Sequence, residues 1–269
     1  MKQILVGLIT GIMLISASCN VINKKEESDQ ITAMDHKVMS VLWYQRSPEV
    51  KALYIQGFNI AKQSLVRHLP EYDKDVKKAV VVDIDETMLN NSPYEASEVF
   101  KGKGYAPDTW KEWTDLMKAK ALPGAVEFSK FAKEHGVEVF YISNRKVNET
   151  ETTLKNLQSE GFEFADEAHI ILRDSVSSKK ARRAIVSENY AIVLLIGDNL
   201  NDFSEVFEDR SDDFGKNIVE MYKDSFGDRF IMMPNPMYGE WEKSAYGDTY
   251  KISNEEKYKK RKEHLMPIK

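Results

Sequence analysis

The sequence contains a single cysteine, Cys19, among its 269 residues, so no disulfide can form within the chain. Histidine is also scarce: the five residues, at positions 36, 68, 135, 169 and 264, show no HxxxH or HxH spacing, which argues against a zinc site. A net charge of -5 at pH 7 leaves no basic field for binding a nucleic acid polymer. The longest apolar run, Ile4–Ile15, is too short to span a bilayer core of about 30 Å.

The first 19 residues have the three-part pattern of a signal peptide: a basic start, an apolar run, and small residues before Cys19. Residues 16–19 resemble a bacterial lipobox, in which the cysteine is acylated and becomes the mature N-terminus. Ser16 stands where that pattern usually has leucine, and cleavage without lipid is the alternative. Residues 20–30 are polar, as in a tether. We therefore expect an exported protein, anchored by lipid to the bacterial cell envelope at the outer membrane.

Short apolar runs alternate with amphipathic stretches over the rest of the chain. Strands are expected at residues 79–82, 137–142, 169–172, 191–196 and 230–233. Helices are expected at residues 31–43, 48–69, 124–135 and 148–160. This alternation predicts an α/β fold, a Rossmann-like parallel sheet with helices on both faces. The long segment after the first strand predicts a smaller helical cap, to which residues 31–75 and about 90–122 contribute.

Polar residues stand where the predicted strands end. In an open parallel sheet such residues gather at one edge, where ligands bind. The four aspartates among them would repel one another unless a cation joined them, and hard oxygen ligands suit Mg²⁺. The residues concerned are Asp83, Asp85 and Thr87 after the first strand, Ser143 and Asn144 after the second, Lys179, and Asp198 and Asp202 after the fourth.

Each of these elements has an ordinary structural explanation when taken alone. Asp83-x-Asp85 is then a loop start with turn-forming side chains, and Lys179 is a solvated lysine beside a helix. Their joint order at the strand ends favours a functional site. A calcium loop of the EF-hand type is excluded, because Met88 and Tyr94 occupy positions that require glycine and glutamate.

The ordered set of Asp83-x-Asp85-x-Thr87, Ser143, Lys179 and Gly197-Asp198-x-x-x-Asp202 resembles the haloacid-dehalogenase (HAD) superfamily, whose phosphatase branch carries the second aspartate. The chain resembles the class C acid phosphatases more closely, over residues 43 to 241. These are bacterial lipoproteins, and the resemblance makes residues 31–269 one phosphatase domain. The matching segments are residues 83–87, 91–94, 122–125, 143–145, 197–200 and 234–239.

The resemblance implies a role for each site residue. Asp83 would attack phosphorus and form an aspartyl-phosphate, and Asp85 would serve as general acid and base. Mg²⁺ would bind the Asp83 carboxylate, the Asp85 backbone carbonyl and Asp198, with Asp202 behind these ligands. Phosphate would be held by four residues, and an aromatic leaving group would lie between two rings. The four residues are Thr87, Ser143, Asn144 and Lys179, and the two rings belong to Trp110 and Tyr238.

These roles predict a Mg²⁺-dependent phosphomonoester hydrolase, an acid phosphatase or 5'-nucleotidase acting on nucleoside monophosphates and aryl phosphates. The resemblance also implies a homodimer formed through the N-terminal helices. The alternative from another class is a surface lipoprotein that binds a ligand without turnover, and intact Asp83 and Asp85 argue against it. Phosphotransfer to an alcohol is a further alternative, because one aspartyl-phosphate serves both reactions. Dehalogenation is disfavoured, since it does not need the acid that Asp85 supplies.

Overall fold

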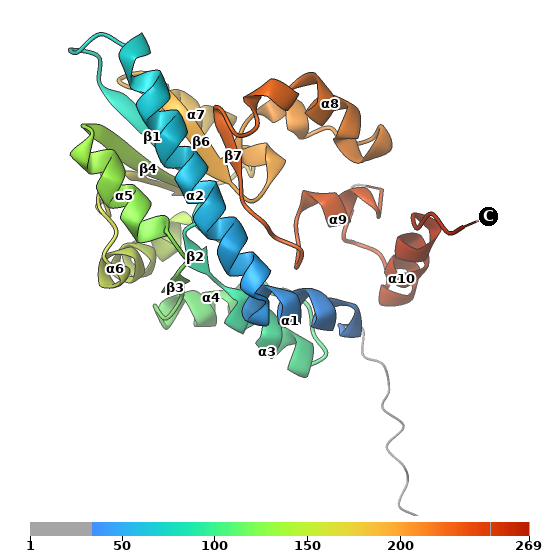
Figure 1. Cartoon of the computed structure of the whole chain (residues 1–269). Coiled ribbons are helices and arrows are strands. Elements are labelled where there is room, and N and C mark those ends of the chain that lie inside the picture. The colour runs from blue at the N-terminus through green and yellow to red at the C-terminus, as the bar shows by residue number, and fades with distance from the viewer. Residues whose placement is uncertain (1–33, 248, 269) are drawn as a thin grey trace, which may run out of the picture. The chain divides into compact units, whose positions relative to one another are not determined.

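A computed structural model describes residues 34–247 and 249–268 of the chain (Figure 1). The signal peptide expected at residues 1–19, the acylation site Cys19 and the tether expected at residues 20–30 lie outside these residues. None of the helices within the described ranges is long and apolar enough to cross a membrane.

A five-stranded parallel sheet lies at the centre of the fold, with the strand order β5-β4-β1-β6-β7. The predicted parallel sheet is therefore confirmed. Ala79–Val82 of β1 are all buried, as expected of a central strand that is covered on both faces. The strands are β1 (Lys78–Val82), β4 (Val137–Lys146), β5 (Ile170–Arg173), β6 (Ala191–Gly197) and β7 (Phe230–Met232).

The side chains of β1 alternate between two hydrophobic cores, one on each face of the sheet. Val80 and Val82 belong to the larger core, to which α2 (Pro48–His68) and α5 (Ala125–Glu134) contribute. Ala79 and Val81 belong to a smaller core with Val186 of α7 (Lys180–Ser187). Helices thus cover both faces, as the alternation of apolar runs predicts.

The helix α2 begins where the sequence predicts. Ser47 is its N-cap, and its hydroxyl accepts the Glu49 N–H at 3.1 Å, while Pro48 occupies the first helical position. The helix packs against β6, β7 and α5, and Figure 1 shows it lying along the sheet. This packing makes α2 part of the layer that covers the sheet.

The segment between β1 and α5 forms a small subdomain of short elements. It contains an antiparallel pair, β2 and β3, and two helices, α3 and α4. The first N-terminal helix, α1, packs against α3, whereas α2 packs on the sheet. Of the N-terminal segment expected in the cap, α1 therefore belongs to the subdomain and α2 to the layer that covers the sheet. The elements are α1 (Val38–Arg46), β2 (Leu89–Asn90), α3 (Ser92–Phe100), α4 (Pro107–Asp115) and β3 (Lys120–Ala121).

The remaining helices flank the sheet or follow it in the chain. α10 buries none of its described residues. α6 packs against β5, β3 and α4. These helices are α6 (Thr150–Glu160), α8 (Lys216–Met221), α9 (Glu240–Ser244) and α10 (Asn254–Glu263).

Candidate active site

The ends of three adjacent strands place the predicted site residues side by side. β1 lies between β4 and β6, and Val82 is in register with both Tyr141 and Ile196. The next residue, Asp83, donates its backbone N–H to the Ile196 carbonyl at 2.9 Å. Its side chain is therefore delivered to the edge of the sheet where parallel strands end.

Three carboxylates meet at this edge. Asp83, Asp198 and Asp202 each offer an oxygen atom, and these atoms all lie within 4.8 Å of one another. The Lys179 ammonium contacts Asp83 Oδ1 and lies 2.6 Å from Asp202 Oδ1. Three ionised carboxylates and one ammonium carry a net charge of -2. A divalent cation would neutralise this group, and carboxylate oxygens are the ligands that hard cations prefer.

The pKa values of Asp83 and Asp198 are both raised. Burial, and then repulsion from Asp202, Asp198 and Asp85, raise the pKa of Asp83 well above its usual value, although Lys179 opposes the shift. Burial and the charge of Asp202 raise the pKa of Asp198 to about 7. Their charged forms therefore need further positive charge, and a bound cation would supply it.

Asp202 is fixed from two sides. Its Oδ2 atom accepts the Asn199 N–H at 3.0 Å, while its Oδ1 atom accepts from Lys179. The chain passes so close that a Cβ atom added at Gly197 would lie 2.2 Å from Asp202 Oδ2. Glycine at position 197 is thus required by the close approach of Asp202 to the end of β6.

The Asp85 carboxylate points to a different set of partners. Arg145 Nη2 donates to its Oδ1 atom at 2.7 Å, and Arg145 Nε donates at 3.0 Å. Asn91 Nδ2 donates at 2.8 Å, and the Ser143 hydroxyl donates to Oδ2 at 3.1 Å. Asp85 is thus held in one orientation by four donors, and its carboxylate is not one of the three that meet at the cluster. Cation binding by its backbone carbonyl stays a prediction.

Arg145 was not assigned a role from the sequence. Its side chain is 1% exposed, and its guanidinium carbon lies 5.8 Å from the centroid of the Trp110 ring. A signal was present, because a charged side chain at the end of a buried strand needs a partner for its charge. Which carboxylate it meets depends on the tertiary fold.

Ser143 and Asn144 lie within β4, which extends beyond the predicted strand end to Lys146. A second unassigned arginine, Arg182 of α7, holds this part of the strand. Its Nη1 atom donates to the Ser143 carbonyl and its Nη2 atom donates to Asn144 Oδ1, both at 2.6 Å. The loop predicted to bind phosphate is therefore tied to the start of the helix that follows Lys179.

Thr87, predicted to bind phosphate, is buried and directed to the carboxylate cluster. Its hydroxyl donates to Asp198 Oδ1 at 3.3 Å, and Asn235 Nδ2 donates to Asp198 Oδ2 at 2.8 Å. Both oxygens of Asp198 are therefore oriented by neutral donors. Thr87 acts on the cluster through Asp198.

Glu86 is fully buried and was also not assigned a role from the sequence. Its backbone is left-handed, with φ of 57°, and its Oε1 atom accepts the Asn91 N–H at 2.7 Å. The Tyr238 hydroxyl donates to its Oε2 atom. Burial, and then the charges of Asp85 and Asp198, raise the pKa of Glu86 well above its usual value. Glu86 thus links the loop after β1 to one of the two predicted stacking residues.

The other predicted stacking residue, Trp110, belongs to a group of three aromatic rings. Its centroid lies 5.1 Å from that of Tyr94, with the rings nearly perpendicular at 87°. Tyr105 lies 6.1 Å away on the same group. Contacts of this kind fix the orientation of the Trp110 ring.

Comparisons with known proteins identify a family and related structures. Residues 8–241 match the family described as HAD superfamily, subfamily IIIB (Acid phosphatase). The class C acid phosphatase from Bacillus anthracis has a solved structure that is 42% identical, with a TM-score of 0.84 over 88% of this chain and 99% of that one. A second structure of it, with tungstate bound, is 41% identical, with a TM-score of 0.83 over the same shares of the two chains.

More distant relatives are found in plants. Acid phosphatase 1 of Solanum lycopersicum is 26% identical over 211 residues, which are 71% of this chain and 75% of that protein. The stem 31 kDa glycoprotein of Glycine max is 26% identical over 194 residues, 70% of this chain. The chain spans 66% of the length of the Glycine max protein.

Proposed function

Because the chain belongs to the acid phosphatases of HAD subfamily IIIB, which are phosphomonoester hydrolases, we propose that it acts through an aspartyl-phosphate on Asp83, with Mg²⁺ at the carboxylate cluster. One observation supports this most directly. Asp83 stands at the end of the central strand, in contact with Lys179 and beside two further carboxylates, while Asp85 is held separately by four donors.

The two aspartates divide the chemistry. A carboxylate oxygen of Asp83 forms a bond to phosphorus as the bond to the ester oxygen breaks. Asp85 gives a proton to the departing alcohol oxygen, and then takes one from the water that attacks the aspartyl-phosphate and releases phosphate. Both carboxyls are restored after one cycle.

The other residues hold the reacting groups. Lys179 orients Asp83, and Ser143 and Asn144 bind phosphoryl oxygens from the end of β4. Mg²⁺ bound to Asp83, Asp198 and the Asp85 carbonyl would reduce repulsion between the nucleophile and the phosphate oxygens. The proposed oxyanion site is supported by the tungstate bound to the Bacillus anthracis protein, since tungstate is a tetrahedral oxyanion like phosphate.

The proposed substrates are nucleoside monophosphates and aryl phosphates. Trp110 is oriented by Tyr94 and Tyr105, and the Tyr238 hydroxyl is bound by Glu86. Two such rings can stack on a planar leaving group, and stacking on an aromatic side chain is worth about 1–3 kcal/mol per base.

The test is hydrolysis of p-nitrophenyl phosphate and adenosine 5'-monophosphate by the purified protein, with Mg²⁺ and with EDTA. Asp83→Asn should lower kcat by at least about 10³-fold, because it removes the nucleophile. Asp115→Asn, an exposed carboxylate paired with Lys111, is the matched control and should retain activity. Full activity of Asp83→Asn would refute the mechanism, and ligand binding without turnover by the wild type would favour a binding lipoprotein.

The proposed enzyme is exported and attached to the cell envelope through an acylated Cys19. The support is the sequence pattern of residues 1–19. Cys19→Ser should abolish the lipid mass on the mature N-terminus and release the protein from the membrane fraction. An unchanged mass and distribution would show that cleavage occurs without lipid attachment.

A homodimer through the N-terminal helices is also proposed. Met39 and Leu42 on α1 are 71% and 50% exposed, and a partner would remove this apolar surface from water. Light scattering after size-exclusion chromatography should show a dimer, and Leu42→Glu should produce the monomer. A monomeric wild type would contradict the proposal.

A further inference from the structure

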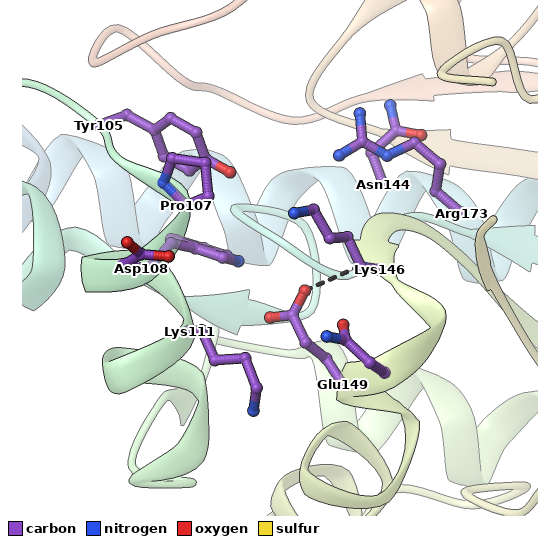
Figure 2. A pocket seen from close by; sticks show the side chains of 10 residues that line it. Tyr105, Pro107, Asp108, Lys111, Asn144, Lys146, Glu149 and Arg173 are labelled. Carbon is purple, nitrogen blue, oxygen red and sulfur yellow. Dashed lines mark hydrogen bonds between the residues drawn. The ribbon is translucent and has the colours of Figure 1, made fainter. Parts of the chain in front are cut away.

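A pocket opens beside the candidate active site, between the subdomain helix α4 and the ends of β4 and β5 (Figure 2). Aromatic rings form one wall, and cationic and amide side chains from the two strand ends form the other. Six of its residues carry the argument: Tyr105, Trp110, Asn144, Lys146, Glu149 and Arg173.

Lys146 and Arg173 are neighbours because of an irregularity in the sheet. Ser143 is in register with Leu172, and the next pair is Lys146 with Arg173, so β4 carries two more residues than β5 between these pairs. The extra residues are Asn144 and Arg145. The irregularity turns Arg145 inward to Asp85 and brings Lys146 beside Arg173.

Within the part of the chain that the structure describes, Lys146 and Arg173 have no acidic partner. Among residues 34–247 and 249–268, no ion pair or side-chain hydrogen bond involves the Lys146 ammonium or the Arg173 guanidinium. Arg173 is only partly exposed, and Figure 2 shows both side chains directed into the pocket with Asn144. Two like charges at adjacent positions repel each other unless an anion lies between them.

Two acidic residues, Asp108 and Glu149, line the pocket, and Glu149 is already satisfied. Glu149 is 2% exposed, and its carboxylate accepts the Thr114 hydroxyl and the Lys146 backbone N–H, both at 2.8 Å. Lys111, which also lines the pocket, is paired with Asp115 at 2.6 Å. Of the three cations that line the pocket, Lys146 and Arg173 are therefore the two that remain available to a ligand, and Asp108 adds one negative charge to the opposite wall.

The pocket adjoins the candidate active site through two of its lining residues. Asn144, which lines it, directly follows Ser143, and Trp110 forms part of its wall. Trp110 lies under the guanidinium of Arg145, which in turn holds Asp85. A leaving group that accepts a proton from Asp85 and stacks on Trp110 would therefore extend toward Lys146 and Arg173.

We infer that Lys146 and Arg173 form a subsite for a second phosphate group, carried on the leaving group of the phosphomonoester that is hydrolysed at Asp83. A guanidinium and an ammonium side by side match a phosphate dianion, which accepts a forked pair of hydrogen bonds from arginine. The base of the leaving nucleoside would stack on the wall formed by Tyr105 and Trp110, and the second phosphate, carried on its ribose, would reach Lys146 and Arg173. This inference rests on the proposed function and narrows its substrates to bisphosphorylated nucleosides and similar compounds.

The experiment compares adenosine 3',5'-bisphosphate with adenosine 5'-monophosphate, using the full chain purified in detergent. Initial rates are followed by chromatography of the products, so that the phosphate removed is identified. The wild type should prefer the bisphosphate in kcat/KM by about tenfold, the size expected of a partly exposed charge-assisted contact. The ratio of the two substrates cancels any general loss of activity.

Two single variants, Arg173→Gln and Lys146→Gln, should each bring this ratio close to one. Lys146→Glu should reverse it, so that the monophosphate becomes the better substrate. Lys111→Gln is the matched control, because it removes a lysine of the same pocket that is already paired, and should keep the wild-type ratio.

A wild-type ratio of kcat/KM near one for the two substrates would overturn the inference. Retention of the wild-type ratio in both Arg173→Gln and Lys146→Gln would also overturn it, as would an equal loss of the ratio in Lys111→Gln. Isothermal titration calorimetry with the same two ligands separates this inference from the proposed function. If the wild type binds the bisphosphate preferentially and Arg173→Gln abolishes this preference, the subsite is supported even if no hydrolysis occurs. Hydrolysis of both compounds with no preference in rate or affinity would refute the subsite alone.

Discussion

The replacement Asp198→Asn should change stability in a way that depends on both pH and Mg²⁺. Burial and the charge of Asp202 raise the pKa of Asp198 from 3.8 to about 7. The stability that the neutral carboxyl provides is fully present below about pH 4 and is lost as the pH rises through about 7. The wild type without metal should therefore lose stability between pH 5 and pH 8, whereas an amide at this position does not ionise.

The size of the effect follows from the same shift. A pKa raised from 3.8 to about 7 corresponds to at most ~4 kcal/mol of folding free energy above pH 7. Asp198 is partly exposed, and solvent screens its charge, so we expect about 2 kcal/mol. Without metal, the stability of Asp198→Asn relative to the wild type should rise by most of this amount between pH 5 and pH 8.

Mg²⁺ should reverse the order of the two proteins at pH 8. A cation that binds only the folded chain stabilises it by about 2.7 kcal/mol at a concentration 100 times its Kd. The wild type should receive this stabilisation in full, and Asp198→Asn should receive less because a carboxylate ligand is missing. At pH 5 the response of the wild type should shrink, since Asp198 must lose a proton to bind the cation.

The assay is urea unfolding of both proteins at pH 5, 6, 7 and 8, with EDTA and with Mg²⁺. The quantity of interest is how the difference in unfolding free energy between the wild type and Asp198→Asn changes with pH. An altered hydrogen bond to Asn235 would add only a constant offset to this difference. Asp115→Asn, at an exposed carboxylate, is the control and should show no such trend. A free energy difference that stays constant from pH 5 to pH 8 in EDTA would refute the reasoning.

Two further replacements test the surroundings of the aspartates. Arg145→Gln removes the bidentate partner of Asp85. The kcat should fall by about 10²-fold for an alkyl phosphate, whose leaving oxygen needs the proton, and by less than tenfold for p-nitrophenyl phosphate. Equal losses on both substrates would point to a general structural defect. Gly197→Ala places a Cβ atom 2.2 Å from Asp202 Oδ2 and should lower the free energy of unfolding by about 1–3 kcal/mol and reduce activity strongly. Gly104→Ala, where the nearest atom is 3.8 Å away, is the control, and equal stability of both variants would contradict the expectation.

The elements of the fold are readable from the sequence because their signals are local. A run of valines that ends in Asp83 predicts a buried strand with a carboxylate at its end, and β1 has that form. The predicted ends of two helices are confirmed as well: Gly136 and Gly161 have φ of 69° and 86° just after α5 and α6, the left-handed conformation that ends a helix. Parallel topology then follows from the alternation of strands and helices.

The convergence of Asp83 and Asp198 at one edge could also be predicted, because parallel strands all end on the same side of the sheet. The order of the strands was not needed for that prediction. The side-chain partners within the edge are a different matter. The sequence places Asp85, Ser143 and Lys179 near one another, yet it does not say that Asp85 is bound by Arg145 and Asn91.

The sequence by itself therefore determined the α/β architecture and the set of acidic and basic residues at the strand ends, since periodicity and strand termini are properties of short segments. The tertiary structure decided which of these residues meet. The two additional residues in β4 turn Arg145 inward and set Lys146 beside Arg173, and the length of such an irregularity depends on the packing of β4 against β5. Contacts between segments that are distant in the chain depend on strand register, which no short segment encodes.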